Sequence, residues 1–292
     1  MRLVSFRGTH GVRPGAVIAT EDGDRILDLG HVVPDVTALI RDDAALAAVR
    51  HEIAESDAAA LPALDATALA PPVTPGKIVC LGYNYRGHVP DGVDPTADDP
   101  ATPDVFIKTP NTLAGPNDAV VIPAVATDAD YEGELAVVIG RRAHAVSLED
   151  ALDHVAGYTI LNDVSDRSWQ RRQSQWALGK CFDGFAPLGP WLVTADAIAD
   201  PQDLLVEVVR DGVVTVSQST STTVFSVAFV VHYLSQVMTL EPGDVVSTGT
   251  PQKLADAQAA HRPLAGGDAV TVRISGIGEL TTTFTGPQET VA

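Results

Sequence analysis

The sequence predicts an α+β fold that is mainly β, with a small N-terminal α/β domain over residues 1–70 and a larger domain over residues 71–292. Two observations lead to this prediction. Short apolar runs, many of them rich in β-branched residues, alternate with Gly, Pro and Asp turn signals along most of the chain, which is typical of strands. Clear helical patterns are confined to a few segments, chiefly 34–59 and 225–238.

The first 70 residues contain short strands and a helical segment. We expect strands at 2–6, 16–19 and 25–29. Glu21-Asp-Gly-Asp24 is a turn signal between the second and third of these strands. Asp35 is placed to cap the helical segment that ends near residue 59. The stretch 61–76 is Pro-rich and has no periodicity, so we place the domain boundary near residue 70.

The remainder of the chain contains most of the predicted strands. We expect strands at 77–81, 105–108, 120–122, 135–139, 158–161, 204–210, 213–218, 244–247 and 269–274. Asp211-Gly212 is the clearest hairpin turn. The capping-box pattern at 147–150 predicts a helix that ends near Gly157, and a polar helical stretch is expected up to about Gln175. Residues 90–103 carry acids and prolines with nothing to bury, so we expect an exposed, mobile loop of the length that is typical of functional loops.

Composition narrows the class of protein. Hydrophobic residues make up 45% of the 292 residues, which is enough for a sizeable core, and the formal net charge is −19. This charge argues against a nucleic acid or an anionic membrane as partner. The two cysteines form no disulfide framework, the N-terminus has no signal-peptide pattern, and no run of 18 apolar residues occurs. A soluble cytoplasmic protein is therefore expected.

Two acids enter a predicted core strand in the segment 130–140. Side chains alternate across a strand, so Glu132 and Glu134 point the same way, roughly 6.5–7 Å apart. Two carboxylates on one buried face repel each other and lose hydration unless something neutralises them. A divalent cation such as Mg²⁺, Mn²⁺ or Ca²⁺ would do so. The alternative is a solvated strand end whose acids pair with Arg or Lys.

Further polar residues have both a structural and a functional interpretation. Asp163 follows a strand and precedes a polar helix, so it is either a helix cap or a third carboxylate for the Glu132/Glu134 site. His88, at the start of the 90–103 loop, is either structural or a general base that Asp91 orients.

Several cations and hydroxyls are candidates for substrate binding. Lys180, flanked by Gly179 and Cys181, suits an anionic substrate or a developing oxyanion, and Lys108 is a weaker candidate for the same role. Arg167 and Gln170 share a helix face, which is either a solvated surface or part of the site. The segment Thr248-Gly-Thr-Pro251, which contains Thr250, is either a plain turn or a carboxylate-binding loop. The sequence contains no Walker loop, no G-x-G-x-x-G, no G-x-S-x-G and no Cys/His zinc cluster.

Together these segments resemble the fumarylacetoacetate hydrolase superfamily, in its branch similar to acylpyruvate and 2,4-dioxo acid hydrolases. The matching segments are KIVCLGYNYRGH (77–88), DYEGELAVVIG (130–140), AGYTILNDVSDRSWQ (156–170), QWALGKCFDGFAPLGPW (175–191), MTLEPGD (238–244) and TGTP (248–251). They follow the family's order over about residues 75–280. The N-terminal 70 residues loosely resemble the small domain that many members carry.

The resemblance implies a mixed β-sandwich roll with few helices, usually assembled as a homodimer. It implies Mg²⁺ (or Mn²⁺ or Ca²⁺) held by Glu132, Glu134 and Asp163, and a small-molecule 2-oxo acid as substrate. The further site residues that it implies are His88 with Asp91 for activating water, Lys180 and Gln170 for the substrate or its enolate, Thr250 for the substrate carboxylate, and Tyr85, Lys108 and Arg167 as further substrate contacts.

The expected function is metal-dependent hydrolysis of a C–C bond in an acylpyruvate or 2,4-dioxo acid, with closure of the 90–103 loop bringing His88 into place. Two departures from the family pattern keep alternatives open. Asp91 stands where many family hydrolases have Glu, and Gln252-Lys-Leu-Ala-Asp256 stands where a Gly-Val-Gly turn is common. A decarboxylase, isomerase or lyase with the same metal site is the second hypothesis, and a metal-bound protein that only binds metabolites is the third.

Overall fold

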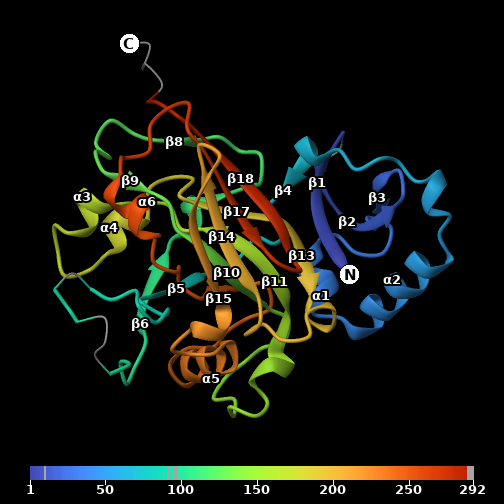
Figure 1. The fold of residues 1–292 in the computed structure, drawn as a ribbon. Coiled ribbons are helices and arrows are strands. Elements are labelled where there is room, and N and C mark those ends of the chain that lie inside the picture. The colour runs from blue at the N-terminus through green and yellow to red at the C-terminus, as the bar shows by residue number, and fades with distance from the viewer. Residues whose placement is uncertain (10, 91, 95–97, 288–292) are drawn as a thin grey trace.

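The computed structural model describes residues 1–9, 11–90, 92–94 and 98–287. It confirms the α+β, mainly β fold (Figure 1). The strands are β1 (Arg2–Gly8), β2 (Gly11–Thr20), β3 (Gly23–Asp28), β4 (Leu69–Ala70), β5 (Ile78–Gly82), β6 (Asp104–Lys108), β7 (Leu113–Ala114), β8 (Val120–Val121), β9 (Ala129–Asp130), β10 (Gly133–Ile139), β11 (Val155–Asn162), β12 (Ser165–Asp166), β13 (Ala186–Thr194), β14 (Leu205–Arg210), β15 (Val213–Ser219), β16 (Val245–Ser247), β17 (Ala269–Ile274) and β18 (Gly278–Thr285). The α-helices are α1 (Val36–Ile40), α2 (Asp43–Glu55), α3 (Arg167–Gln170), α4 (Ala177–Lys180), α5 (Val227–Val237) and α6 (Ala255–Ala259). No helix in the described part of the chain is long and apolar enough to cross a membrane.

A large mixed sheet has the strand order β3-β2-β1-β13-β11-β10-β16-β5-β6. Its central strands β10 and β11 are antiparallel, with Glu134 opposite Leu161, and β16 pairs with β5 in parallel. Strand β1 pairs with β13, so the N-terminal strands β1, β2 and β3 belong to the same sheet as strands that follow residue 70 (Figure 1).

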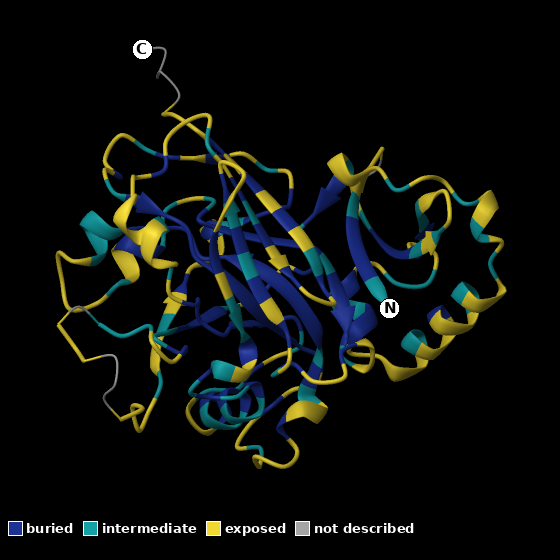
Figure 2. Cartoon of the chain, viewed as in Figure 1, coloured by how far each residue is buried: buried dark blue, intermediate teal, exposed yellow. Residues whose placement is uncertain are grey.

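A second sheet, in the order β15-β14-β17-β18-β8, packs against β10, β11 and β13. Its hairpin turns at Asp211 and Gly212, both at positive φ, as the Asp-Gly signal predicts. Val137 of β10 and Val208 of β14 belong to the apolar core between the sheets, and Figure 2 shows these central strands as largely buried. Gly133 at the start of β10 lies against this core, where an added Cβ would come within 2.6 Å of Val208 Cγ2.

A second apolar core includes residues from both sides of the predicted boundary near residue 70. Leu3, Leu27 and Leu39 share it with Val138 and Leu188. The division into domains 1–70 and 71–292 therefore stays a prediction, because one sheet and one core extend across it.

Several predicted helices differ from the structure. The stretch 34–59 forms two helices, because Asp42 accepts hydrogen bonds from the amides of Ala44 and Ala45 and so begins a second helix. The prediction of a helix that ends near Gly157 is wrong, because a single 3₁₀ turn at Ala151–His154 leads directly into β11. The polar helical stretch is only the single turn α3.

Candidate active site

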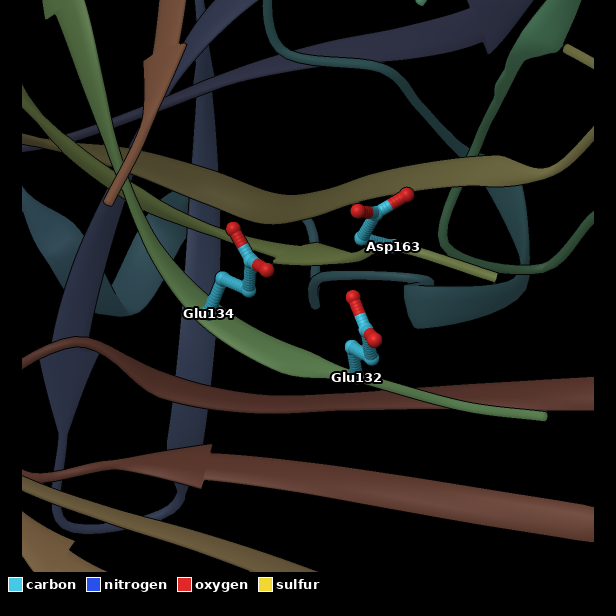
Figure 3. A group of neighbouring side chains, drawn as sticks. All are labelled: Glu132, Glu134 and Asp163. Carbon is cyan, nitrogen blue, oxygen red and sulfur yellow. The ribbon is translucent and has the colours of Figure 1, made fainter. Parts of the chain in front are cut away.

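Three buried carboxylates meet where β10 and β11 lie side by side. Glu132 and Glu134 flank Gly133, so alternation along the chain turns both toward Asp163, which directly follows β11 (Figure 3). The amide of Asp163 donates to the carbonyl oxygen of Glu132 over 2.8 Å, which holds the two segments together. One ligand oxygen from each of the three residues lies within 4.8 Å of the others.

Two lysines balance part of this negative charge. Lys180 Nζ donates to Glu132 Oε2 over 2.6 Å and to Asp163 Oδ2 over 2.5 Å. Lys108 Nζ donates to Asp163 Oδ1 over 2.6 Å and to the carbonyl oxygen of Val164 over 3.0 Å. Lys180 reaches this position because α4 lies close to α3: an added Cβ at Gly179 would lie 2.6 Å from the backbone nitrogen of Gln170.

Glu134 carries a buried oxygen that lacks a partner. Its Oε2 accepts hydrogen bonds from Ser247 Oγ and, over 3.0 Å, from the amide of Gly249. Its Oε1 has no hydrogen-bond partner among the described residues. Burial, followed by the nearby charges of Asp163 and Glu132, raises the pKa of Glu134 well above its ordinary value. An unpartnered carboxylate oxygen beside two further carboxylates fits a hard divalent cation, which prefers oxygen ligands.

Glu132, unlike Glu134, is paired with the cation Arg167. Burial disfavours the charged form of Glu132, but Arg167 and Lys180 outweigh it and hold the pKa of Glu132 well below its ordinary value. Arg167 Nη2 lies 2.6 Å from Glu132 Oε1 and 3.0 Å from Asp130 Oδ2, and Nη1 donates to Gln170 Oε1 over 2.9 Å. Arg167 is thus part of the buried site, and the alternative of a solvated helix surface is wrong for it.

A cavity of about 830 Å³ opens onto these groups. Residues that line it include Glu132, Glu134, Lys180, Arg167, Gln170, His88, Thr250, Tyr83, Phe106, Trp176, Tyr131, Lys253 and His261. Segments that are far apart in the sequence therefore meet here: the end of β5, β6, the start of β10, the α3–α4 region and the chain after β16.

His88 is held by a backbone group. Its Nδ1 lies 2.8 Å from the carbonyl oxygen of Thr250, an acceptor, so Nδ1 carries the hydrogen. In the neutral ring the lone pair then lies on Nε2, which suits a general base. Asp91 lies outside the described residues, so its pairing with His88 stays a prediction.

Two predicted substrate contacts lie elsewhere. Tyr85 and Lys108 are not among the described residues that line the cavity. Tyr85 is buried and Tyr83 lies at the wall instead, edge-on to His88 with ring centroids 5.4 Å apart. Lys108 contacts the back of the site through Asp163. Both residues therefore stay predictions as substrate contacts.

The helix-cap interpretation of Asp163 is also wrong. Asp166 caps α3, because its Oδ1 accepts from the amide of Trp169 over 2.9 Å. Sequence reasoning assigned no role to Asp130 or Ser247, and it named Gly249 and Lys253 only as parts of longer segments. Ser247 ends an apolar strand directly before the Thr-Gly-Thr-Pro segment, and this was the signal available for it.

The chain is similar to several known proteins over most of its length. The family model described as fumarylacetoacetate (FAA) hydrolase C-terminal matches residues 77–285. The mitochondrial oxaloacetate tautomerase FAHD2A of Bos taurus is 38% identical over 285 residues, covering 95% of this chain and 90% of that protein. The structure of maleylpyruvate hydrolase from Sphingobium sp. SYK-6 in complex with manganese(II) and pyruvate is 30% identical, with a TM-score of 0.78 and coverage of 99% of this chain and 100% of that one.

A second solved structure carries a different activity in its title. The 2-hydroxyhepta-2,4-diene-1,7-dioate isomerase from Mycobacterium marinum is 31% identical, with a TM-score of 0.74 and coverage of 99% of this chain and 100% of that one. The family match covers well over half of the chain, and the first relative covers nearly all of it. The chain therefore belongs to the fumarylacetoacetate hydrolase family.

Proposed function

We propose that the protein is a divalent-metal-dependent hydrolase that cleaves a C–C bond in an acylpyruvate or a related 2,4-dioxo acid. The observation that carries this proposal is the buried, unpartnered Oε1 of Glu134 beside Glu132 and Asp163 in the described structure. Mg²⁺ is the expected ion, with Mn²⁺ or Ca²⁺ as alternatives, and Glu132, Glu134 and Asp163 would hold it. The ion would supply Lewis-acid stabilisation of negative charge on the oxygens of the 2-oxo acid.

The side chains of this chain then divide the reaction between them. His88 Nε2 takes a proton from water, and the resulting hydroxide attacks the C4 carbonyl carbon. The C3–C4 bond breaks and leaves the pyruvate enolate. The ammonium group of Lys180 would stabilise the negative charge of this enolate. The proton returns to C3, so that one water is consumed and the products are a carboxylic acid and pyruvate. Thr250 and Gln170, which line the cavity, would bind the substrate.

A second candidate is tautomerisation or isomerisation of a similar 2-oxo acid. The printed names of the bovine tautomerase and the mycobacterial isomerase favour it. His88 alone suffices for this reaction, because a proton moves between C3 and an oxygen or carbon of the same substrate without water attack. The cavity of about 830 Å³ leaves room for a substrate longer than a four-carbon diacid, which both the hydrolase and an isomerase could use.

Product analysis in labelled water tests the proposal. The metal-loaded protein is incubated with 2,4-dioxo acids and, separately, with enol-oxaloacetate in H₂¹⁸O. A hydrolase releases pyruvate and a carboxylic acid that contains one ¹⁸O, whereas a tautomerase changes only the enol absorbance. Release of pyruvate without label in the acid, or no release at all, would show that hydrolysis is not the reaction.

Variants assign the roles. Glu132→Gln should abolish turnover if this residue holds the metal. His88→Ala should lower the hydrolysis rate by about 10²–10⁴-fold, while Glu279→Gln, an exposed residue on β18, should leave it unchanged. Homodimer assembly and a cytoplasmic location stay predictions.

A further inference from the structure

Two chemically different groups of side chains line the cavity. Tyr83, Phe106 and Trp176 form an aromatic cluster with edge-on contacts: Trp176 lies 5.7 Å from Tyr83 and 5.5 Å from Phe106, measured between ring centroids. A further part of the wall comes from the segment 250–261 and from α3. It carries cationic or ionisable groups in a chain whose net charge is −19. Lys253 is the most buried of those on the segment 250–261, with 15% of its side chain exposed.

The identity of residue 253 is unusual for this chain. The sequence holds 19 Lys and Arg residues, of which only four are Lys: Lys77, Lys108, Lys180 and Lys253. Lys108 and Lys180 contact carboxylates of the proposed metal site, and Lys253 contacts the neighbouring Asp130. Most cationic residues of this protein are arginines, so a lysine at position 253 is not one of many solvated surface lysines.

Lys253 keeps hydrogen-bonding capacity for a ligand. Its Nζ pairs with Asp130 Oδ1 and lies 4.2 Å from the ring centroid of Tyr131. An ammonium group has three donors, and the pair with Asp130 uses one of them. Asp130 also accepts from Arg167 Nη2 over 3.0 Å, so this carboxylate keeps a charged partner when Lys253 turns toward a ligand.

The balance of buried charge favours an anionic ligand. Four carboxylates (Asp130, Glu132, Glu134 and Asp163) contact or neighbour four cations (Lys108, Lys180, Arg167 and Lys253). With all eight ionised these groups are neutral together, and a divalent cation would add two positive charges. Buried charges are stable only when they are compensated, so the metal-loaded site favours an anionic substrate.

We propose that Lys253 binds a second, distal anionic group of the substrate, so that the preferred substrates are 2-oxo acids with a carboxylate at each end. The 2-oxo acid end lies at the three carboxylates, which rests on the proposed function, and the distal carboxylate lies against the wall formed by residues 250–261. Lys253 is then a specificity-determining residue that contacts substrate and has no part in breaking the bond.

Binding of unreactive ligands to the Mn²⁺-loaded protein tests this proposal apart from turnover. 2-Oxohexanedioate and 2-oxohexanoate have the same chain length and the same 2-oxo acid end, and both lack the 4-oxo group that hydrolysis requires. Titration calorimetry gives the ratio of their affinities. We expect the dicarboxylate to bind the unmodified protein at least 10-fold more tightly than its partner.

Lys253→Gln removes the charge but keeps an N–H donor for Asp130, and Lys253→Arg keeps the charge. In the Gln variant the affinity ratio should fall to within about twofold of one, and in the Arg variant most of it should remain. Arg273→Met on β17, which breaks an exposed ion pair with Glu279, is the matched control and should keep the full ratio. Melting temperatures measured in parallel identify any variant that fails to fold, and the wild-type ratio remains a test without the variants.

Each outcome is decisive. A wild-type ratio near one, or a ratio that Lys253→Gln leaves intact, overturns the proposal. A Gln variant that weakens both ligands equally also overturns it, because Lys253 then acts through Asp130 and Arg167. A preference for the dicarboxylate that depends on Lys253, in a protein that hydrolyses no 2,4-dioxo acid, would keep this inference and reject the hydrolase. Hydrolysis without any such preference would do the reverse.

Discussion

Lys180 Nζ lies 2.6 Å from Glu132 Oε2, so an ammonium group already contacts one of the three carboxylates that we expect to bind metal. Burial lowers the pKa of Lys180, but Asp163 and Glu132 outweigh this effect and raise it above its ordinary value. Lys180 therefore stays protonated at neutral pH. In the metal-free site it is a positive charge held against Glu132 and Asp163.

Replacing Lys180 with Met should separate metal binding from catalysis. Loss of the ammonium group leaves the carboxylates with more negative charge, so Mn²⁺ should bind at least as tightly as before. Turnover should fall by about 10²–10³-fold, the range for removing one group that stabilises a developing oxyanion. Mn²⁺ titration and steady-state kinetics on the same sample check both parts. Weaker Mn²⁺ binding together with unchanged turnover would contradict the assigned role.

Glu134→Gln should weaken metal binding without harming the metal-free fold. The substitution removes a ligand charge, and we expect Mn²⁺ affinity to fall by more than ~100-fold, since even groups that only orient a ligand contribute 10–100-fold. It also removes a buried carboxylate whose Oε1 lacks a partner in the described chain, so the metal-free melting temperature should stay the same or rise. Glu279→Gln is the surface control. A lower metal-free melting temperature with unchanged Mn²⁺ affinity would show that Glu134 has a purely structural role.

Metal affinity should rise with pH because Glu134 must lose a proton to bind the ion. Its pKa is raised in the folded protein, against about 4.3 when unfolded. The stability that its protonation contributes is therefore complete below about pH 4.3 and is lost as pH rises through the raised value. Calorimetry of Mn²⁺ binding in buffers of different ionisation enthalpy gives the number of protons released.

Ser247→Ala sharpens this test. Ser247 Oγ donates to the charged form of Glu134, so its removal should raise the pKa of Glu134 further and increase proton release at a given pH. Proton release that is zero at every pH below 7, in both proteins, would show that Glu134 is already ionised in the metal-free site.

The sequence supported the strands better than the short helices, for a physical reason. Runs such as 135–139 are β-branched and apolar, so they have one stable environment, the interior of a sheet. The capping-box pattern at Ser147 is a local signal only. Ser147 Oγ does contact Asp150. However, β11 already begins at Val155, which pairs with Ile139 of β10, so a helix cannot continue to Gly157.

The sequence predicts those parts of the site that depend on neighbouring residues in one strand, and not the contacts between distant segments. Glu132 and Glu134 followed from alternation along one strand. Asp163 was ambiguous, because the choice between cap and ligand depends on the register of β10 and β11, which places Gly133 opposite Asn162. Lys253 pairs with Asp130 across 123 positions of the chain. No local pattern encodes that contact, and only the folded structure shows it.

Removing residues 1–70 should test the predicted domain division. The remaining chain, 71–292, would lose β1 from the edge of β13 and the side chains of Leu3, Leu27 and Leu39 from a core that it shares with Val138 and Leu188. An uncovered apolar face and an unpaired strand edge favour aggregation. We therefore expect the truncated chain to aggregate or to melt well below the full-length protein, as judged by size-exclusion chromatography and circular dichroism. A monodisperse fragment that melts cooperatively and binds Mn²⁺ with unchanged affinity would instead establish residues 71–292 as an independent domain, because the carboxylates of the site all lie within it.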